Sequence, residues 1–310
     1  MLDVKRLRIL REVVAQGSFS AAADTLYLSQ SAVSQQIATL EREVGMTLLE
    51  RTRDGTKPTD AGRVLVAHAD AAICRLDEAE RELAQIAGLE GGEIRIASFP
   101  SASATLLTLA VSDFVRRHPK VKLRVADAEP EVSLPKLRAG DLDLAITFDY
   151  PSLPEPEERD VEHTLLLTES MHVALPIDHP LAAKASVRMT DLADEDWLSG
   201  GCPSSCGLIV SEACREAGFE PRIGFESDDY HVLQGFIAAG LGVTLLPDLA
   251  LHTLRKDVVV RPTEPEAPMR RVFAATRKTR SAATDAMLTS LVEAGERFAR
   301  QTAVRLEAVA

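Results

Sequence analysis

The sequence contains no unbroken apolar run of the roughly 20 residues that a membrane-spanning helix requires. Its first residues, Met1 to Arg6, also lack the apolar core of a signal peptide. We therefore expect the protein to be cytoplasmic and to have no membrane partner. In that compartment its four cysteines are expected to be reduced thiols.

The motifs of common enzyme classes are missing as well. The sequence has no Gly-x-Ser-x-Gly element, no His-Glu-x-x-His zinc motif and no Gly-rich phosphate loop. Its seven histidines are scattered, and His172 lies in an apolar run that is typical of a core position. These absences predict that the protein is not an enzyme and that it holds no cofactor and no metal.

Acidic residues outnumber basic ones, and the net charge of −12 does not by itself suggest a nucleic-acid partner. The excess is unevenly distributed, because residues 1–63 hold nine basic and eight acidic residues whereas residues 64–310 hold 26 and 39. A length of 310 residues predicts two or three domains. The composition thus fits a small DNA-reading module attached to an acidic body.

Three helices are predicted in the amino-terminal part of the chain. Apolar residues recur at helical spacing from Val4 to Val14, and Gly17 ends this helix. Ser18 or Ser20 can cap the second helix, and Ser29 can cap the third. The third helix has one apolar stripe, which is formed by Val33, Ile37, Leu40 and Val44.

The opposite face of the third helix carries short hydroxyl and amide side chains. Such groups match the hydrogen-bonding edges of bases in the major groove, and Gln35 can read adenine through two bonds. A turn at Asp54 and Gly55, flanked by basic residues, predicts a hairpin wing that contacts the phosphate backbone. The expected DNA-binding residues are Ser18, Ser20, Ser29, Gln30, Ser31, Ser34, Gln35, Arg51, Arg53 and Lys57.

A long helix is predicted from Thr59, its cap, to about Ala87. Apolar residues alternate along it in steps of four and three, at Leu65, Ala69, Ala72, Leu76, Ala79, Leu83 and Ile86. This spacing is typical of a coiled-coil seam between two chains, and packing against the helix's own domain is the alternative. The expected dimerisation residues are Leu65, Leu76 and Leu83. Gly88 to Gly92 are expected to form a hinge.

From Glu93 onward, short β-rich runs alternate with helices, a pattern that predicts a parallel α/β sheet. A second lobe is expected from about Leu165, and the last helix, about Ala282–Arg300, is expected to return to the first lobe. Two lobes joined by crossing strands enclose a cleft, and ligands bind beyond the carboxyl ends of strands. The expected effector-binding residues are Ser98, Ser101, Phe148, Cys202, Ser204 and Asp228. For each serine, a helix cap or a turn is the alternative role.

Four strings in the amino-terminal region carry a family resemblance. They are Gly17-Ser18-Phe19-Ser20-x-Ala22-Ala23, Leu28-Ser29-Gln30-Ser31-Ala32-Val33-Ser34-x-Gln36-Ile37-x-x-Leu40-Glu41, Leu49-x-Arg51 and Thr59-x-Ala61-Gly62. With them the chain resembles a LysR-type transcriptional regulator, although Ser31 stands where the family usually has proline and Gln35 where arginine is frequent. Weaker matches continue toward the carboxyl terminus, for example Ala239-Gly240-x-Gly242-Val243.

The resemblance implies an α/β protein with a winged helix-turn-helix at 1–58, a long linker helix at 59–90 and an effector domain at 91–303. That last part is expected to be a two-lobed, periplasmic-binding-protein-like α/β domain, with lobe one at about 91–164 and 269–303 and lobe two at about 165–268. The implied function is sequence-specific DNA binding that is switched by a small-molecule effector held between the lobes. The implied partners are operator DNA, the effector, further copies of the chain in a dimer or tetramer, and RNA polymerase.

Three cysteines near the predicted cleft leave alternatives open. Cys202, Cys206 and Cys214 can be inert small residues, a redox switch or a soft-metal site, and the inert interpretation is preferred. The peroxide-sensing branch of the family uses two cysteines in this region, and the nearest such pair here, Cys206 and Cys214, is eight residues apart. The alternative functions are a thiol-based redox regulator of the same fold and a cytoplasmic small-molecule-binding protein without a regulatory role.

Overall fold

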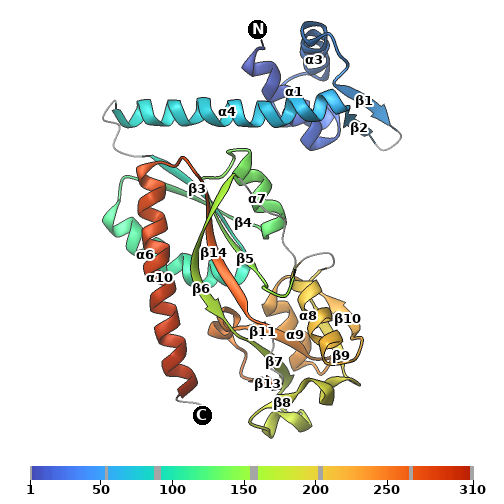
Figure 1. Ribbon diagram of the computed structural model, residues 1–310, viewed down its shortest axis with the longest axis vertical. Coiled ribbons are helices and arrows are strands. Elements are labelled where there is room, and N and C mark those ends of the chain that lie inside the picture. The colour runs from blue at the N-terminus through green and yellow to red at the C-terminus, as the bar shows by residue number, and fades with distance from the viewer. Residues whose placement is uncertain are drawn as a thin grey trace. The chain divides into compact units, whose positions relative to one another are not determined.

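The computed structural model describes residues 2–52, 55–86, 92–153, 160–201, 205–264 and 268–307. The chain divides into two compact units, residues 1–89 with 138–141 and residues 90–137 with 142–310 (Figure 1). Each unit has apolar cores of its own. Within the described ranges, no helix is long and apolar enough to cross a membrane.

The first unit consists of three short helices, a β-hairpin and one long helix. Its elements are α1 Val4–Gln16, α2 Phe19–Thr25, α3 Gln30–Val44, β1 Leu49–Thr52, β2 Gly55–Pro58 and α4 Asp60–Ile86. Side chains of Asp3, Ser18 and Ser29 accept hydrogen bonds from the first turns of α1, α2 and α3. Ser18, rather than Ser20, is thus the cap of the second helix. Thr59 caps α4, as predicted, by accepting a hydrogen bond from the Gly62 amide at 3.1 Å.

One apolar core holds this unit together. Its buried members include Leu10, Val13, Val33, Ile37, Leu40, Leu48, Ala69 and Ile73. Because Ala69 and Ile73 are each only 1% exposed, the first half of α4 belongs to this core. The hairpin docks on the turn before α2, where the Thr56 amide donates to the Gly17 carbonyl at 2.8 Å.

The first lobe of the second unit is built on a five-stranded sheet. Its elements are β3 Glu93–Ser98, α5 Pro100–Ala102, the π-helical turn η1 Ser103–Leu107, α6 Thr108–Arg117, β4 Lys122–Asp127, α7 Pro130–Arg138, β5 Leu144–Asp149, β6 Val161–Glu169, β14 Arg270–Arg277 and α10 Ala282–Glu307. The strand order is β4-β3-β5-β14-β6. The pairing of β3 with β4 and β5 is parallel, as predicted, whereas the returning strand β14 is antiparallel to both of its neighbours.

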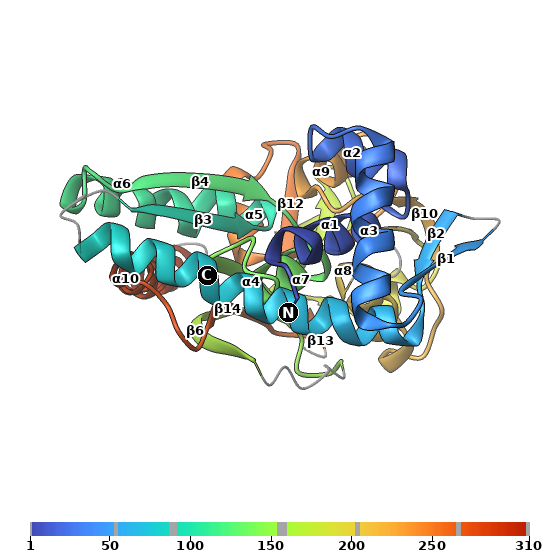
Figure 2. The ribbon, with the colours of Figure 1, turned by 90° about the horizontal axis from the view of Figure 1, so that it is seen from above.

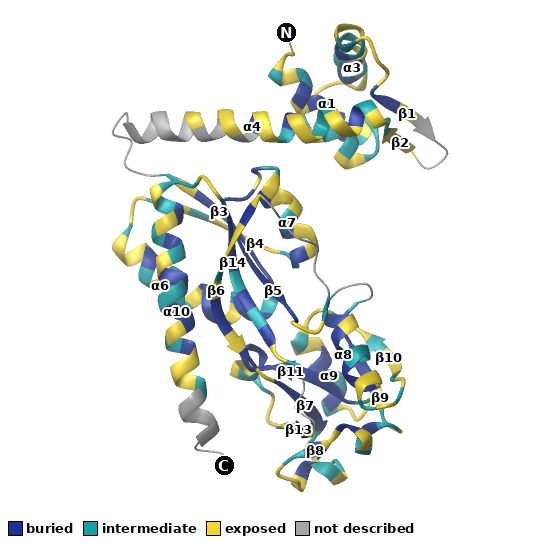
Figure 3. Cartoon of the chain, viewed as in Figure 1, coloured by how far each residue is buried: buried dark blue, intermediate teal, exposed yellow. Residues whose placement is uncertain are grey.

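Helices cover both faces of this sheet, so its central strand β5 is buried along its whole length (Figure 3). Ile146 faces the core that contains Phe114 of α6 and Leu291 of α10. Its neighbour Ala145 faces the opposite core, which contains Leu137 of α7. The continuous apolar run of β5 in the sequence follows from this double cover.

The second lobe is a smaller α/β layer. Its elements are β7 Met171–Pro176, η2 Pro180–Ala183, β8 Val187–Arg188, η3 Met189–Leu192, β9 Asp196–Ser199, α8 Ser205–Glu216, β10 Arg222–Glu226, α9 Tyr230–Ala238, β11 Thr244–Pro247, η4 Asp248–Thr253, β12 Val258–Arg261 and β13 Thr263–Glu264. The strands pair in the orders β11-β7-β12 and β10-β9, and a bridge between Trp197 and Val243 joins the two groups. The chain passes between the lobes at Ser170, between β6 and β7, and again between β13 and β14.

Candidate DNA interface and effector site

The outer face of α3 is uncharged at its amino-terminal end. Gln30, Ser31 and Gln35 are exposed and Ser34 is half-buried, while the apolar stripe faces the core. The Ser29 cap fixes where the helix begins, and its hydroxyl also lies 3.0 Å from that of Ser31. Figure 2 shows α3 running from α2 toward the β1–β2 hairpin. Such a helix presents only amide and hydroxyl groups to a base edge.

The carboxylates on α3 are engaged within the unit. Arg6 of α1 pairs with Glu43 and also donates to the Gln36 side chain at 3.2 Å. The Glu41 carboxylate accepts from the amides of Leu48, at 2.8 Å, and of the next residue. These bonds hold the start of the hairpin against the end of α3, so negative charge is drawn away from the outward face.

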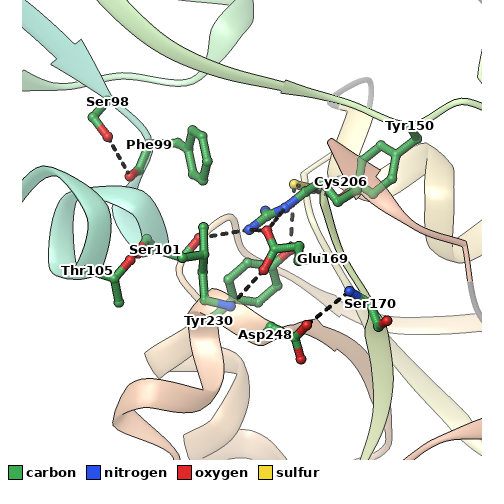
Figure 4. Close-up of polar contacts among 12 residues, drawn as sticks. Ser98, Phe99, Ser101, Thr105, Tyr150, Glu169, Ser170, Cys206, Tyr230 and Asp248 are labelled. Atoms are coloured by element: carbon green, nitrogen blue, oxygen red, sulfur yellow. Dashed lines mark hydrogen bonds and ion pairs between the residues drawn. The ribbon is translucent and has the colours of Figure 1, made fainter. Parts of the chain in front are cut away.

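The second unit contains an ion pair where its two lobes meet. Arg270, at the start of β14, is fully buried, and its Nε donates to Glu169 Oε1 at 2.7 Å. Its Nη2 donates to the Ser101 hydroxyl at 3.2 Å. The other oxygen of Glu169 accepts from the Leu249 amide of η4 at 2.7 Å. Residues of both lobes are thus joined through one buried carboxylate (Figure 4).

Aromatic rings enclose the Arg270 guanidinium. It lies 5.0 Å from the ring centre of Phe99 and 5.1 Å from that of Phe148, within the range of cation–π attraction. Burial is the largest single effect and lowers the pKa of Arg270, but Glu169 and the neighbouring Tyr230, Tyr150 and Cys206 together outweigh it, so the pKa is raised and the group stays protonated. Its Nη1 is buried and makes no hydrogen bond with any residue that the structure describes.

Cys206 lies beside this ion pair, at the first turn of α8. Its sulfur is 3.9 Å from the Tyr150 hydroxyl and 3.8 Å from that of Tyr230 (Figure 4). Burial raises the pKa of Cys206 to about 11 and that of Cys214 to about 12, so both thiols are protonated at neutral pH. Cys206 and Cys214 lie eight residues apart on one helix, roughly 12 Å along its axis, which exceeds the reach of a disulfide.

Acidic groups line the mouth of the same junction. The Glu131 carboxylate of α7 accepts from the Ser205 amide at 3.2 Å and so links the first lobe to α8. The Asp228 carboxylate accepts from the Gly201 amide at 2.9 Å. Burial, and next the charge of Asp228, raises the pKa of Glu129 to about 7. The crevice bounded by Cys206 and Asp228 is too narrow to admit a water molecule.

Two family models match the chain, and together they account for both units. The model of the bacterial regulatory helix-turn-helix protein, lysR family, matches residues 4–63. The model of the LysR substrate binding domain matches residues 87–296. The chain belongs to the LysR family of bacterial transcriptional regulators.

Individual relatives agree with this assignment. This chain is 29% identical over 247 residues to the transcriptional dual regulator GltC of Bacillus subtilis. The aligned region covers 80% of this chain and 81% of GltC. It is 29% identical over 276 residues to a hydrogen peroxide-inducible genes activator of Dickeya chrysanthemi, and the alignment covers 87% of this chain and 88% of that one. The structure of a full-length OxyR variant from Pseudomonas aeruginosa superimposes with a TM-score of 0.68 at 26% identity. The superposition covers 96% of this chain and 95% of that one.

This LysR-type regulator therefore combines a DNA-binding helix-turn-helix with an effector-binding domain, as the sequence predicted. The predicted DNA residues divide into three groups. Gln30, Ser31, Ser34, Gln35, Ser20 and Lys57 lie at least partly at the surface; Ser18 and Ser29 act as caps; the side chains of Arg51 and Arg53 lie outside the described part of the chain.

The predicted effector residues of this LysR-type regulator also differ in their surroundings. Ser101 and Phe148 contact Arg270, whereas the buried Ser98 donates to the carbonyl of the next residue. Asp228 is exposed at the mouth, and Cys202 and Ser204 lie outside the described residues. Arg270 and Glu169 were not predicted from the sequence. In the sequence each is a charged residue at the end of an apolar run. Charged residues at exposed strand ends show the same pattern, so the two cases cannot be distinguished from the sequence.

Proposed function

We propose that this regulator binds a dyad-symmetric operator as a homodimer or a pair of dimers. In this arrangement α3 enters the major groove and the β1–β2 hairpin holds the phosphate backbone. The uncharged outward face of α3 supports this proposal, because Gln35 can bond a base edge without repelling the DNA. RNA polymerase is the further partner through which such a protein acts on transcription.

Gln35→Ala should relax base preference at one position in each half-site, at a cost of roughly 1–3 kcal/mol there. The matched variant Lys57→Ala should instead weaken binding to all sequences equally and lower the salt slope by about one. Footprinting and fluorescence anisotropy over a range of salt concentrations measure both effects. A footprint without dyad symmetry, or equal sequence profiles for Gln35→Ala and wild type, would contradict the assignment.

We propose that the effector is a small carboxylate, amino acids included, that binds where the lobes meet. The unbonded Nη1 of Arg270 carries this proposal, since a buried charged donor without an acceptor is costly and a carboxylate oxygen would satisfy it. Asp228 adds a negative group that suits an ammonium ion, and Glu129, with its pKa raised to about 7, adds a second one when it is ionised. The crevice at Cys206 and Asp228 is lined by second-lobe residues and does not admit water, so side chains there have to move when the effector enters.

The movement of side chains on effector entry connects effector binding to regulation. A ligand that binds better to one arrangement of the lobes shifts the population toward it. The resulting change passes to the DNA-binding unit through the hinge predicted at Gly88–Gly92, which lies outside the described residues except for Gly92.

Ser101→Ala should abolish the response to the effector while leaving operator affinity unchanged. The Ser101 hydroxyl contacts Arg270, whereas α3 and the hairpin belong to the other unit. A thermal-shift panel of small carboxylates and amino acids identifies responding compounds, and footprinting shows their effect on DNA. Ser112→Ala, at an exposed position of α6, is the control. Responses that survive in Ser101→Ala, or a panel without any response, would refute the site.

The redox alternative receives no support from the described thiols. Protonated, buried sulfurs react slowly with peroxide, and Cys206 and Cys214 are too far apart along α8 to form a disulfide. The effector-responsive function is therefore the one we propose.

A further inference from the structure

A second pocket of about 410 Å³ lies between α10 and the second lobe. Its walls are η4 and β12 on one side and the end of α10 on the other. It shares no lining residue with the crevice at Cys206. Its volume falls within the range of small-molecule sites, roughly 300–1,000 Å³.

The pocket is mainly apolar. Apolar walls are formed by Leu251, Leu254, Val258, Val260 and Phe298. Phe298 is 7% exposed and Val258 is 4% exposed, so both are fixed by the packing behind them. A rigid apolar wall of this kind accommodates an aromatic ring or a short alkyl chain by excluding water from it.

One polar residue of the pocket, Arg261, carries a charge without a counter-charge among the described residues. Arg261 donates to three backbone carbonyls, those of Lys184, Ala182 and Val260, each at 2.7 Å. These bonds fix the guanidinium but leave its positive charge uncompensated, because Arg261 forms no ion pair with a described carboxylate. A guanidinium has five N–H donors, so donors remain for an anionic ligand.

The acidic residue of the pocket is already engaged. Asp248 Oδ2 accepts from the Ser170 amide at 3.1 Å, and its Oδ1 lies 2.8 Å from His172 Nε2. His172, expected from the sequence to be a core residue, is indeed buried. The pocket therefore offers one uncompensated positive group beside an apolar surface.

We propose that this pocket is a second ligand site, which binds a monocarboxylate with an apolar aromatic or alkyl body. The carboxylate pairs with Arg261, and the body packs on Leu251, Leu254 and Phe298. Because η4 and β12 belong to the second lobe and α10 to the first, an occupant joins the two lobes from outside their junction. It stabilises the lobe arrangement in which both walls are in place, independently of an effector at Arg270.

Isothermal titration of the full-length protein with 3-phenylpropionate, octanoate, 3-phenylpropanol and acetate tests the proposal. At this pocket the first two should bind with a stoichiometry of one per chain, the alcohol more weakly and acetate not at all. Leu251→Trp should fill the pocket and abolish binding of 3-phenylpropionate. Leu254→Trp provides a second such variant if the first does not fold. Failure of both carboxylates to bind, or binding unchanged in a folded tryptophan variant, would overturn the proposal.

Matched variants separate charge from packing and this site from the junction. Arg261→Gln should weaken 3-phenylpropionate about fivefold, as expected for one partly solvated ion pair, while Arg261→Lys keeps most of the affinity. Arg255→Gln, at an exposed arginine paired with Asp257, and Ser101→Ala should both bind like wild type. Equal affinities for the Gln and Lys variants of Arg261, or loss of binding in Ser101→Ala, would refute the site. Tighter binding by a chain that ends at Thr302 would identify the protein's own terminus as the occupant and overturn it as well.

Discussion

Arg270→Met is expected to lower the free energy of unfolding by about 3–5 kcal/mol. The substitution leaves the Glu169 carboxylate buried, at 2% exposure, without its counter-charge. The Leu249 amide alone cannot compensate for the lost solvation of that charge. The guanidinium contacts with Phe99 and Phe148 are lost at the same time.

Urea unfolding, followed by circular dichroism and by the fluorescence of the single tryptophan, Trp197, measures this effect. Arg271→Met is the matched control, because that neighbouring arginine is 42% exposed and its ion pair with Asp149 is partly solvated. The double variant Arg270→Met/Glu169→Leu should recover most of the loss, since it leaves no uncompensated charge. Equal stabilities for the Arg270 and Arg271 single variants would show that the buried ion pair lacks the assigned role.

Leu76→Asp should dissociate the proposed dimer and lower operator affinity roughly 100-fold or more, because two linked readers gain that much from binding together. Leu76 is 45% exposed in a single chain, and Ala72 and Ala79 along the same side of α4 are exposed as well. A seam between two copies would cover these residues, and an aspartate at its centre would be buried without a partner.

Light scattering and operator titration test this second prediction together. Ala71→Asp introduces the same charge at an exposed position away from the seam and should leave both the mass and the affinity unchanged. A wild-type protein that is monomeric at micromolar concentration, or a Leu76→Asp variant that stays dimeric, would contradict the dimer. Leu65 is unsuitable for this test, because it packs against the core of its own unit.

The predicted seam of α4 shows what apolar periodicity alone can and cannot predict. Steps of four and three predict one apolar stripe, but the spacing is the same whether a residue faces its own domain or a second chain. The structure divides the stripe: Leu65 and Ala69 pack against α1 and its neighbours, while Leu76 stays exposed. Leu83 lies where side chains are not described, so its role remains a prediction.

The amino-terminal module was determined almost entirely by local sequence. The caps at Ser29 and Thr59, the glycine that ends α1 and the polar face of α3 each depend on residues a few positions apart, and they are found where they were predicted. Short-range chemistry of this kind can be recognised in a single sequence.

The junction between the lobes was decided only by the tertiary structure. The sequence predicted alternating strands and helices, and with them a cleft near Ser101 and Phe148. It did not indicate that Arg270 would reach Glu169, 101 residues earlier in the chain, or that the two would lie between aromatic rings. The physical reason is that the insertion of β14 between β5 and β6 places its first residue inside the molecule. Because Arg270 is buried there, its charge is compensated by Glu169. Its Nη1 makes no hydrogen bond with any described residue.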